Sequence, residues 1–163
     1  MRAAIAIMGL LVLGGCAAEI PSTEQPAMYL NMADGSAKLD PQAAASMISQ
    51  YRQNNGLGLV VVDPELMKIA EVQSQAMASH NKLDHDVKAP LAQRLNTSGY
   101  PTTLAVENVS AGYHTLAEAF SGWRDSPPHR ANMLNSGVTK LGIAASYAPN
   151  TKYKVFWTLI LAS

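Results

Sequence analysis

The chain has 163 residues, with 12 basic and 12 acidic side chains that give a formal net charge of +0 at pH 7. This balanced charge comes without basic clusters and argues against nucleic acid as a partner. Hydrophobic residues make up 48% of the chain and charged residues 15%, which excludes the composition of a disordered protein. The length suits one compact domain with a substantial core.

The first 15 residues are typical of an export signal. Arg2 supplies a short positive region, and the apolar run from Ala3 to Gly15 is too short to span a bilayer. We therefore expect residues 1–15 to act as a signal peptide and the protein to be exported.

The apolar run ends in Leu13-Gly14-Gly15-Cys16, which resembles the lipobox of bacterial lipoproteins. Cys16 is the only cysteine of the chain, and we expect it to be lipidated and to anchor the protein to a membrane of the cell envelope. Ala17 follows in place of an inner-membrane retention aspartate, so the outer membrane is the default in a Gram-negative cell. The alternatives are an ordinary cleaved signal with an incidental cysteine, or a buried apolar helix.

The segment after the signal is poor in large apolar residues. Residues 16–39 are rich in Ala, Pro, Ser, Thr, Gln and Gly, a composition that predicts a lipidated tether. An ordered strap lying on the domain is the alternative. Residues 40–163 are expected to form the folded domain, a monomer that depends on packing because one cysteine cannot form an internal disulfide.

Two helices begin with the same signal. Asp40-Pro41 and Asp63-Pro64 each combine an N-cap with a proline at the first helical position. We expect the first helix to stop at Gly56 and the second to run to about His80. The inward face of the second helix has helical spacing and consists of Leu66, Ile69, Ala70, Gln73, Ala76 and Met77.

The middle of the chain has weaker patterns. Residues 81–114 are expected to be mostly irregular, with a short helix at residues 90–96. A third clear helix begins at Thr115-Leu116-Ala117-Glu118, which has the capping-box pattern. A last helical turn is expected at residues 129–134.

The period changes from helix to strand near the C-terminus. Residues 141–148 and 153–161 flank Pro149-Asn150-Thr151 and predict an antiparallel hairpin. The second of these strands is apolar on both faces, so it needs cover on both sides. These elements predict an α+β layered domain.

Three separated motifs carry most of the functional information. They are Leu83-Asp84-His85, Glu107-Asn108, and the segment from Trp123 to Arg130. Together with Asn55-Gly56-Leu57 upstream, their order resembles the CAP (SCP-like) superfamily over about residues 45–162. The likeness is strongest to its short, disulfide-free bacterial members. The resemblance implies an αβα sandwich with helices on either side of a small antiparallel sheet.

The resemblance also implies a metal site. In that family two histidines and the glutamate of the Glu-Asn pair face one cleft and bind zinc or a similar divalent ion in many members. The matching residues here are His85, His129 and Glu107. Local spacing alone cannot bring these residues together, and from the sequence alone each histidine is better explained as a loop residue.

The chain departs from the family pattern near the second histidine. Many members carry a second acidic residue three or four positions after the tryptophan, where this chain has Ser126 and Pro127. Asp125 lies one residue too early. Pro128 replaces a glycine, and because proline fixes φ, the loop must differ there. A His/Glu/His set is therefore expected, rather than the complete tetrad.

Two roles are open for Glu107. It could act as a catalytic general base on a metal-bound water, or it could hold the backbone around it. Asn108 is interpreted as structural because an asparagine amide ties turns together. Asp125 and Arg130 are supporting candidates, Arg130 as a clamp for a carboxylate or a helix end.

Three functions follow from these residues. The preferred one is an envelope-anchored lipoprotein whose cleft binds a divalent metal, a small apolar ligand, or a lipid, cell-wall or protein partner. The second is a zinc-dependent hydrolase acting on a peptide or a cell-wall component. The third is a purely structural interaction module. Whether the protein is an enzyme is left open, because the family resemblance supplies a fold and a cleft but no common reaction.

Overall fold

Both Asp-Pro pairs begin helices, as predicted. In the computed structural model, which describes residues 24–163, Asp40 Oδ1 accepts hydrogen bonds from the backbone N–H groups at the start of helix α1, Pro41–Gln53. Asp63 does the same for α2, Pro64–His80. Gly56 follows α1 in a left-handed turn with φ of 75°, a conformation that glycine adopts without strain. The predicted signal peptide and Cys16 lie outside the described residues.

The sheet has four strands in the order β1-β3-β4-β2. The predicted hairpin is present as β3, Lys140–Ala148, and β4, Lys154–Ala162, which pair antiparallel. Strand β2, Ala105–Ala111, pairs antiparallel with the other side of β4. The two-residue β1, Val61–Val62, pairs parallel with the beginning of β3.

Strand β2 corrects the prediction that residues 81–114 are mostly irregular. The segment reads Ala-Val-Glu-Asn-Val-Ser-Ala, and its central polar pair interrupts the apolar alternation that marks a strand. Pairing with β4 supplies the missing stability, since Ala105 to Ala111 face Ala162 to Phe156 in register. Tertiary contacts therefore decide the structure of this segment.

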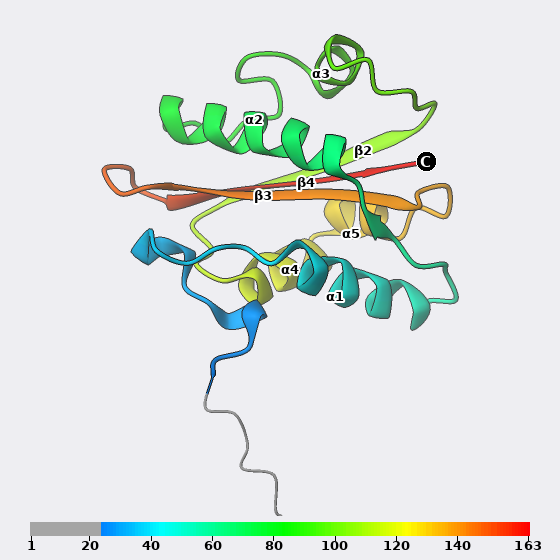
Figure 1. Ribbon diagram of the computed structural model, residues 1–163, viewed down its shortest axis with the longest axis horizontal. Helices are drawn as coiled ribbons and strands as arrows, with labels where there is room; N and C mark the ends of the chain where they lie inside the picture. Colours follow the sequence, from blue (N-terminus) through cyan, green and yellow to red (C-terminus); the bar gives the residue numbers. More distant parts are fainter. Residues whose placement is uncertain (1–23) are drawn as a thin grey trace, which may run out of the picture.

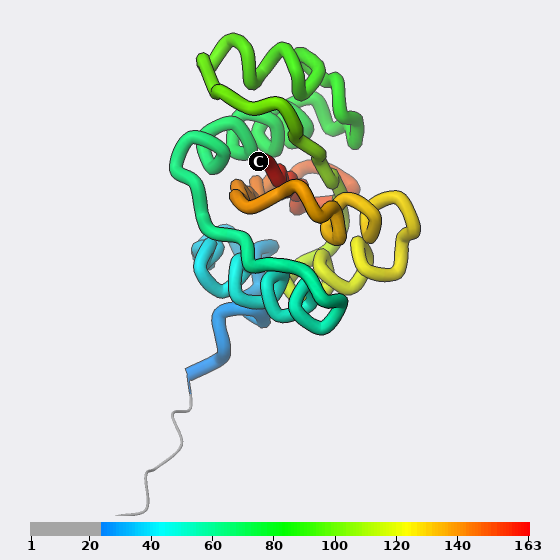
Figure 2. The backbone as a smooth tube through the Cα atoms, turned by 90° about the vertical axis from the view of Figure 1, so that its right-hand side faces the viewer, coloured from blue at the N-terminus to red at the C-terminus, as the bar shows by residue number. Residues whose placement is uncertain are grey.

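Helices cover both faces of the sheet (Figure 1). Helices α2 and α3, Leu91–Thr97, lie on one face. Helix α1 lies on the other, with α4, Leu116–Asp125, and α5, Pro127–Met133. The view turned by 90° shows the same three layers (Figure 2). The α+β class and the αβα sandwich are thereby confirmed.

The core lies in both interlayer spaces. Residues 155–162 of β4 are all buried, which explains why this strand is apolar on both faces. Trp123 and Trp157 are buried on the α1 side, where Trp157 Nε1 donates to Tyr113 O at 2.8 Å. On the other side α2 packs directly on β3. The approach is so close at Gly142 that a Cβ atom there would overlap the backbone of Leu66.

The segment before α1 lies on the domain from residue 27 onward. Two short 3-10 turns, Ala27–Tyr29 and Met32–Asp34, precede α1. Met32 is buried, and its N–H donates to His114 O at 2.8 Å. Leu39 packs against the same core. Residues 27–39 thus form an ordered strap on the domain, the alternative to a tether. No helix within residues 24–163 has the length and apolar character needed to cross a membrane.

Arg52, in the last turn of α1, connects this helix to the end of α5 and to the loop before β3. Its side chain is 1% exposed and donates four hydrogen bonds of 2.8–3.0 Å, all to backbone carbonyls and none to a carboxylate. The acceptors are Gly58, Met133, Asn135 and Val138. Burial lowers the pKa of the guanidinium, which nevertheless stays charged at neutral pH.

Replacing Arg52 should destabilise the whole domain. Arg52→Leu removes a donor from four backbone carbonyls, and the bonds to Met133 and Val138 are buried. We expect a loss of about 3 kcal/mol or more in the free energy of unfolding measured in urea. The control is Arg124→Leu, which removes an exposed arginine paired with Asp125 and should change stability by less than about 1 kcal/mol. Equal losses in the two variants would contradict the role assigned to Arg52.

Candidate functional site

Strand β2 carries the central residues of the site at consecutive positions. Glu107 and Asn108 are 6% and 1% exposed. Because neighbouring side chains on a strand point to opposite faces, the two side chains reach opposite layers of the sandwich. Glu107 contacts the segment after α2 and the helix α3, and Asn108 contacts α5.

Both carboxylate oxygens of Glu107 have partners. Oε1 lies 2.9 Å from His85 Nδ1, and Oε2 accepts a hydrogen bond from Arg94 Nη2 at 2.7 Å. An ionised carboxylate only accepts hydrogen bonds, so His85 Nδ1 carries the proton. The other ring nitrogen, Nε2, is then the one available to a ligand, and 51% of the His85 side chain is exposed.

Arg94 and Gln73 hold the segment that carries His85. Arg94 is 7% exposed and also donates from Nε to Ala89 O at 3.1 Å. Gln73, on α2, is fully buried, and its Nε2 donates to the carbonyls of Asp84 and His85 at 2.8 and 3.0 Å. These contacts fix the backbone at His85, while Glu107 fixes its ring.

Arg94 belongs to the site although no sequence pattern indicates it. Arg94 lies on a short helix between irregular segments, and no local pattern indicates that it is buried. Gln73 can be recognised from the sequence, because it is a polar residue on the inward face of α2. A fully buried amide needs hydrogen-bond partners, and here they are the carbonyls beside the site.

His129 is held from the other face of β2. Asn108 Nδ2 donates to His129 O at 3.0 Å, and Asn108 Oδ1 accepts from Asn132 Nδ2 at 2.9 Å. Asn132, a second residue that no sequence pattern indicates, also donates to Glu107 O at 3.1 Å. It lies three residues after His129, so the two share one side of α5. The Glu-Asn pair thus supports both histidine-bearing segments.

The pKa of His129 is lowered, first by burial of the half-buried ring and second by the charge on His85. Both histidine segments are hydrogen-bonded to adjacent residues of β2, His85 to Glu107 and His129 to Asn108. A lowered pKa keeps His129 neutral at pH 7, which is the form that binds a metal ion.

The unusual Ser-Pro-Pro sequence begins α5. Ser126 is the N-cap residue, and Pro127 and Pro128 occupy the first helical positions, where a missing N–H removes no helical hydrogen bond. Asp125 is exposed and pairs with Arg124 at 2.9 Å. Arg130 is also exposed. Within residues 24–163, neither Asp125 nor Arg130 hydrogen-bonds to His85, Glu107 or His129.

Two imidazoles, those of His85 and His129, are the candidate donors for a metal ion. Within the described chain, no three His, Cys, Asp or Glu side chains are grouped so that they could hold one ion. Glu107 is engaged with a guanidinium and an imidazole, so its position suits a carboxylate behind a ligating histidine. His85 Nε2 and a ring nitrogen of His129 are the atoms that would bind, and imidazole nitrogen suits zinc.

The fold and these residues place the chain in a known family. The sequence model of the cysteine-rich secretory protein family (CAP) matches residues 45–161, well over half of the chain. The protein belongs to this family.

Its relatives include bacterial proteins of larger size. It is 28% identical over 130 residues to YkwD of Bacillus subtilis strain 168, an uncharacterised protein. That match covers 78% of this chain and 50% of YkwD. It is also 28% identical to an extracellular protein of Bacillus anthracis that contains an SCP domain, with a TM-score of 0.65. That match covers 74% of this chain and 39% of the other, so this chain spans half or less of both relatives.

A protein of more similar length shares the fold at lower identity. The outer surface protein of Borrelia burgdorferi has a TM-score of 0.70 and 20% identity to this chain. The match covers 77% of this chain and 93% of the Borrelia protein. The Bacillus anthracis and Borrelia burgdorferi relatives are thus an extracellular and an outer surface protein, which agrees with export of this one.

The lowered pKa of His129 can be tested by NMR. We expect its ring to titrate below the ordinary histidine value of about 6.5, and the midpoint to rise in His85→Ala because one of the two causes is removed. Burial remains in that variant, so the midpoint should stay below the ordinary value.

The lowered pKa of His129 also makes the stability of the fold depend on pH. The unfolded chain takes up a proton at His129 before the folded chain does. The contribution of His129 to stability is therefore complete above the ordinary pKa and decreases as the pH falls below it. A His129 midpoint at or above that of exposed His114, in the same spectra, would contradict this environment.

Proposed function

We propose that this protein is an exported CAP-domain lipoprotein of the cell envelope that binds a divalent cation, zinc first, through His85 and His129. The lipid on Cys16 would hold it at the membrane. The ion and the surface around it would form the binding site for an envelope partner or a small ligand.

The observation that carries the proposal is the buried Arg94–Glu107–His85 arrangement. Glu107 is 6% exposed and bonds to the imidazole at 2.9 Å and to the guanidinium at 2.7 Å. A carboxylate on one nitrogen of a histidine fixes the ring and its tautomer and raises the basicity of the other nitrogen. Glu107 therefore prepares His85 for a ligand, and the neutral form of His129 supplies a second nitrogen.

The same arrangement favours binding over hydrolysis. A general base must be free to take a proton from the reacting group. Here both oxygens of Glu107 are engaged, so accepting a proton would weaken its pairing with Arg94 inside a buried site. A zinc ion would supply Lewis acidity when bound, and the contacts of Glu107 support a role in orienting His85 rather than a role as the base.

Envelope localisation rests on the sequence and the relatives. The Leu13-Gly14-Gly15-Cys16 motif provides the lipidation site, and the Bacillus anthracis and Borrelia burgdorferi relatives are extracellular and outer surface proteins. Several acyl chains on one cysteine would give durable anchoring, at about 0.8 kcal/mol for each buried CH₂ group.

Zinc titration tests the metal site. The mature chain, residues 16–163 with Cys16→Ser, is stripped of metal and titrated by calorimetry. We expect one zinc ion per chain, with affinity lost by about 100-fold or more in His85→Ala and His129→Ala because each removes one of two ligands. Glu107→Gln should lose about 10–100-fold, the usual effect of removing a carboxylate behind a ligating histidine.

His114→Ala is the matched control, because His114 is an exposed histidine of the same chain and should not change the affinity. If the unsubstituted chain binds zinc no better than His85→Ala, the metal site is wrong and a structural interaction module is the better account. A Glu107→Gln variant with unchanged affinity would refute the supporting role of Glu107.

A further inference from the structure

The edge of the sheet opposite the histidine site is only partly covered. Strand β1 pairs with β3 at Val61–Lys140 and Val62–Leu141, and the chain then leaves the sheet to form α2. From Ile143 to Ala148, strand β3 is paired with β4 on one side only within residues 24–163. Six residues of strand edge remain, about 20 Å at 3.3 Å per residue.

The hydrogen-bonding groups on this edge can be assigned. Leu141 O accepts from Asp63 N at 2.8 Å, so the odd-numbered residues of β3 direct their backbone groups away from β4. The Ile143 N–H reaches only a thioether, Met67 Sδ at 3.2 Å. The N–H and C=O groups of Ala145 and Tyr147 have no backbone partner in the described chain.

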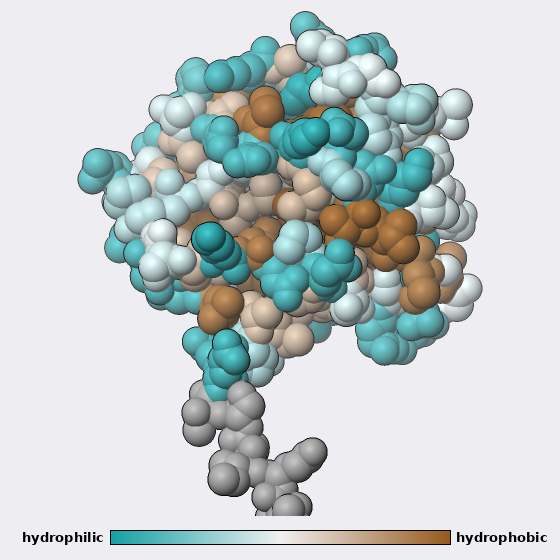
Figure 3. All heavy atoms as spheres, viewed as in Figure 1, coloured by the Kyte–Doolittle hydropathy of each residue, from teal (hydrophilic) through white to brown (hydrophobic). Residues whose placement is uncertain are grey.

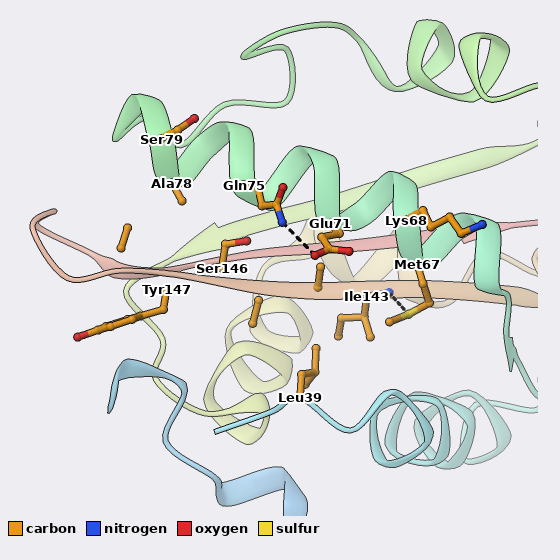
Figure 4. Close-up of a pocket in the computed structure, with 13 residues that line it drawn as sticks. Leu39, Met67, Lys68, Glu71, Gln75, Ala78, Ser79, Ile143, Ser146 and Tyr147 are labelled. Carbon is orange, nitrogen blue, oxygen red and sulfur yellow. Dashed lines mark hydrogen bonds between the residues drawn. The ribbon is translucent and has the colours of Figure 1, made fainter. Parts of the chain in front are cut away.

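A groove of about 680 Å³ runs along this edge (Figure 4). Lys68, Glu71 and Gln75 of α2 form its upper wall, and Leu39 lies below the strand. Ile143 and Tyr147 complete the apolar lower side. In the space-filling view, beige and brown side chains cross the middle of this face below the teal residues of the upper helices (Figure 3).

The edge lacks the features that usually prevent pairing with another strand. Free edges are commonly protected by charged residues, proline or a bulge. Residues 143–148 read Ile-Ala-Ala-Ser-Tyr-Ala and contain neither charge nor proline, and their pairing with β4 runs without a bulge. An extended backbone has the spacing needed to pair with the outward N–H and C=O groups of this strand.

The charges on the upper wall indicate the polarity of the occupant. Lys68 is paired with Glu65 at 2.7 Å, whereas the side-chain carboxylate of Glu71 accepts from the neutral amide of Gln75 at 2.9 Å. Glu71 has no ion-pair partner in the described chain, so a basic side chain on the incoming strand would complement it. On the lower side, Leu39 and Tyr147 would contact apolar side chains.

We propose that the β3 edge at residues 143–148 binds an extended peptide segment of a partner protein, with apolar and basic residues in alternation. Backbone hydrogen bonds would provide the attachment, and the two walls would select the alternating side chains. This surface is separate from the histidine site and does not depend on a metal ion.

The test is a peptide titration of the 15N-labelled mature chain with Cys16→Ser. The probe is acetyl-Val-Lys-Val-Lys-Val-Lys-amide at millimolar concentration. We expect saturable shifts at residues 143–148 and about tenfold slower exchange of the Ala145 and Tyr147 amide protons, because both gain acceptors. The Val/Glu counterpart should bind about threefold more weakly, and Glu71→Lys should reverse this preference.

N-methylated probes test strand addition directly. Methyl groups on either all valine or all lysine nitrogens block one edge of the peptide, so one isomer should lose about tenfold or more in affinity and the other should keep it. Gln93→Lys, a charge change on α3 away from this groove, is the control for Glu71→Lys and should not reverse the preference.

Three results would overturn the proposal: no saturable binding, equal binding of both N-methylated isomers, or slow exchange of Ala145 and Tyr147 before peptide is added. The last would mean that the edge is already occupied. Sedimentation would then distinguish a second copy, which gives a concentration-dependent mass, from the chain's own N-terminal residues, which do not.

Discussion

Glu107 is the residue on which the arrangement of the site depends. A buried carboxylate is costly unless it is paired and hydrogen-bonded, and here two partners from different segments provide those bonds. Arg94 comes from α3 and His85 from the loop after α2. Because the buried carboxylate of Glu107 needs both partners, it fixes both segments against β2. Asn108, the next residue, does the same for α5 on the other face. Two adjacent polar residues on one strand thereby connect both helical layers.

This arrangement is the basis for proposing binding rather than hydrolysis. Both carboxylate oxygens of Glu107 are engaged, one with His85 and one with Arg94. The lowered pKa of His129 keeps the second imidazole neutral, which suits a ligand for a cation. The histidine site lies along β2, and the open segment of β3 lies at the other side of the same sheet, so the two surfaces can be occupied independently.

Local chemistry predicted much of the fold. Asp40-Pro41, Asp63-Pro64 and the Thr115 capping box determine where three helices start, because each supplies its own N-terminal hydrogen bonds. The C-terminal hairpin follows from the change in apolar period. Strand β2 could not be predicted in this way, since the polar pair at its centre is buried through contacts with residues distant in the sequence.

The site was only partly predictable for the same reason. The family resemblance selected His85, Glu107 and His129. The structure bonds His85 to Glu107 and ties the backbone of His129 to Asn108, the next residue on β2. Arg94 and Asn132 had no signal in the sequence, because their function depends on where α3 and α5 pack relative to β2. Gln73 shows what can be recovered, since a polar residue on an inward helix face must have a buried partner.

The most direct test of this account is the tautomer of His85, read from long-range 1H–15N correlations of its ring at neutral pH. If Glu107 orients the ring, Nδ1 carries the proton and Nε2 is unprotonated and free to bind a ligand. A neutral ring protonated at Nε2, or a mixture of both tautomers in fast exchange, would show that Glu107 does not hold His85 and would contradict the proposed site.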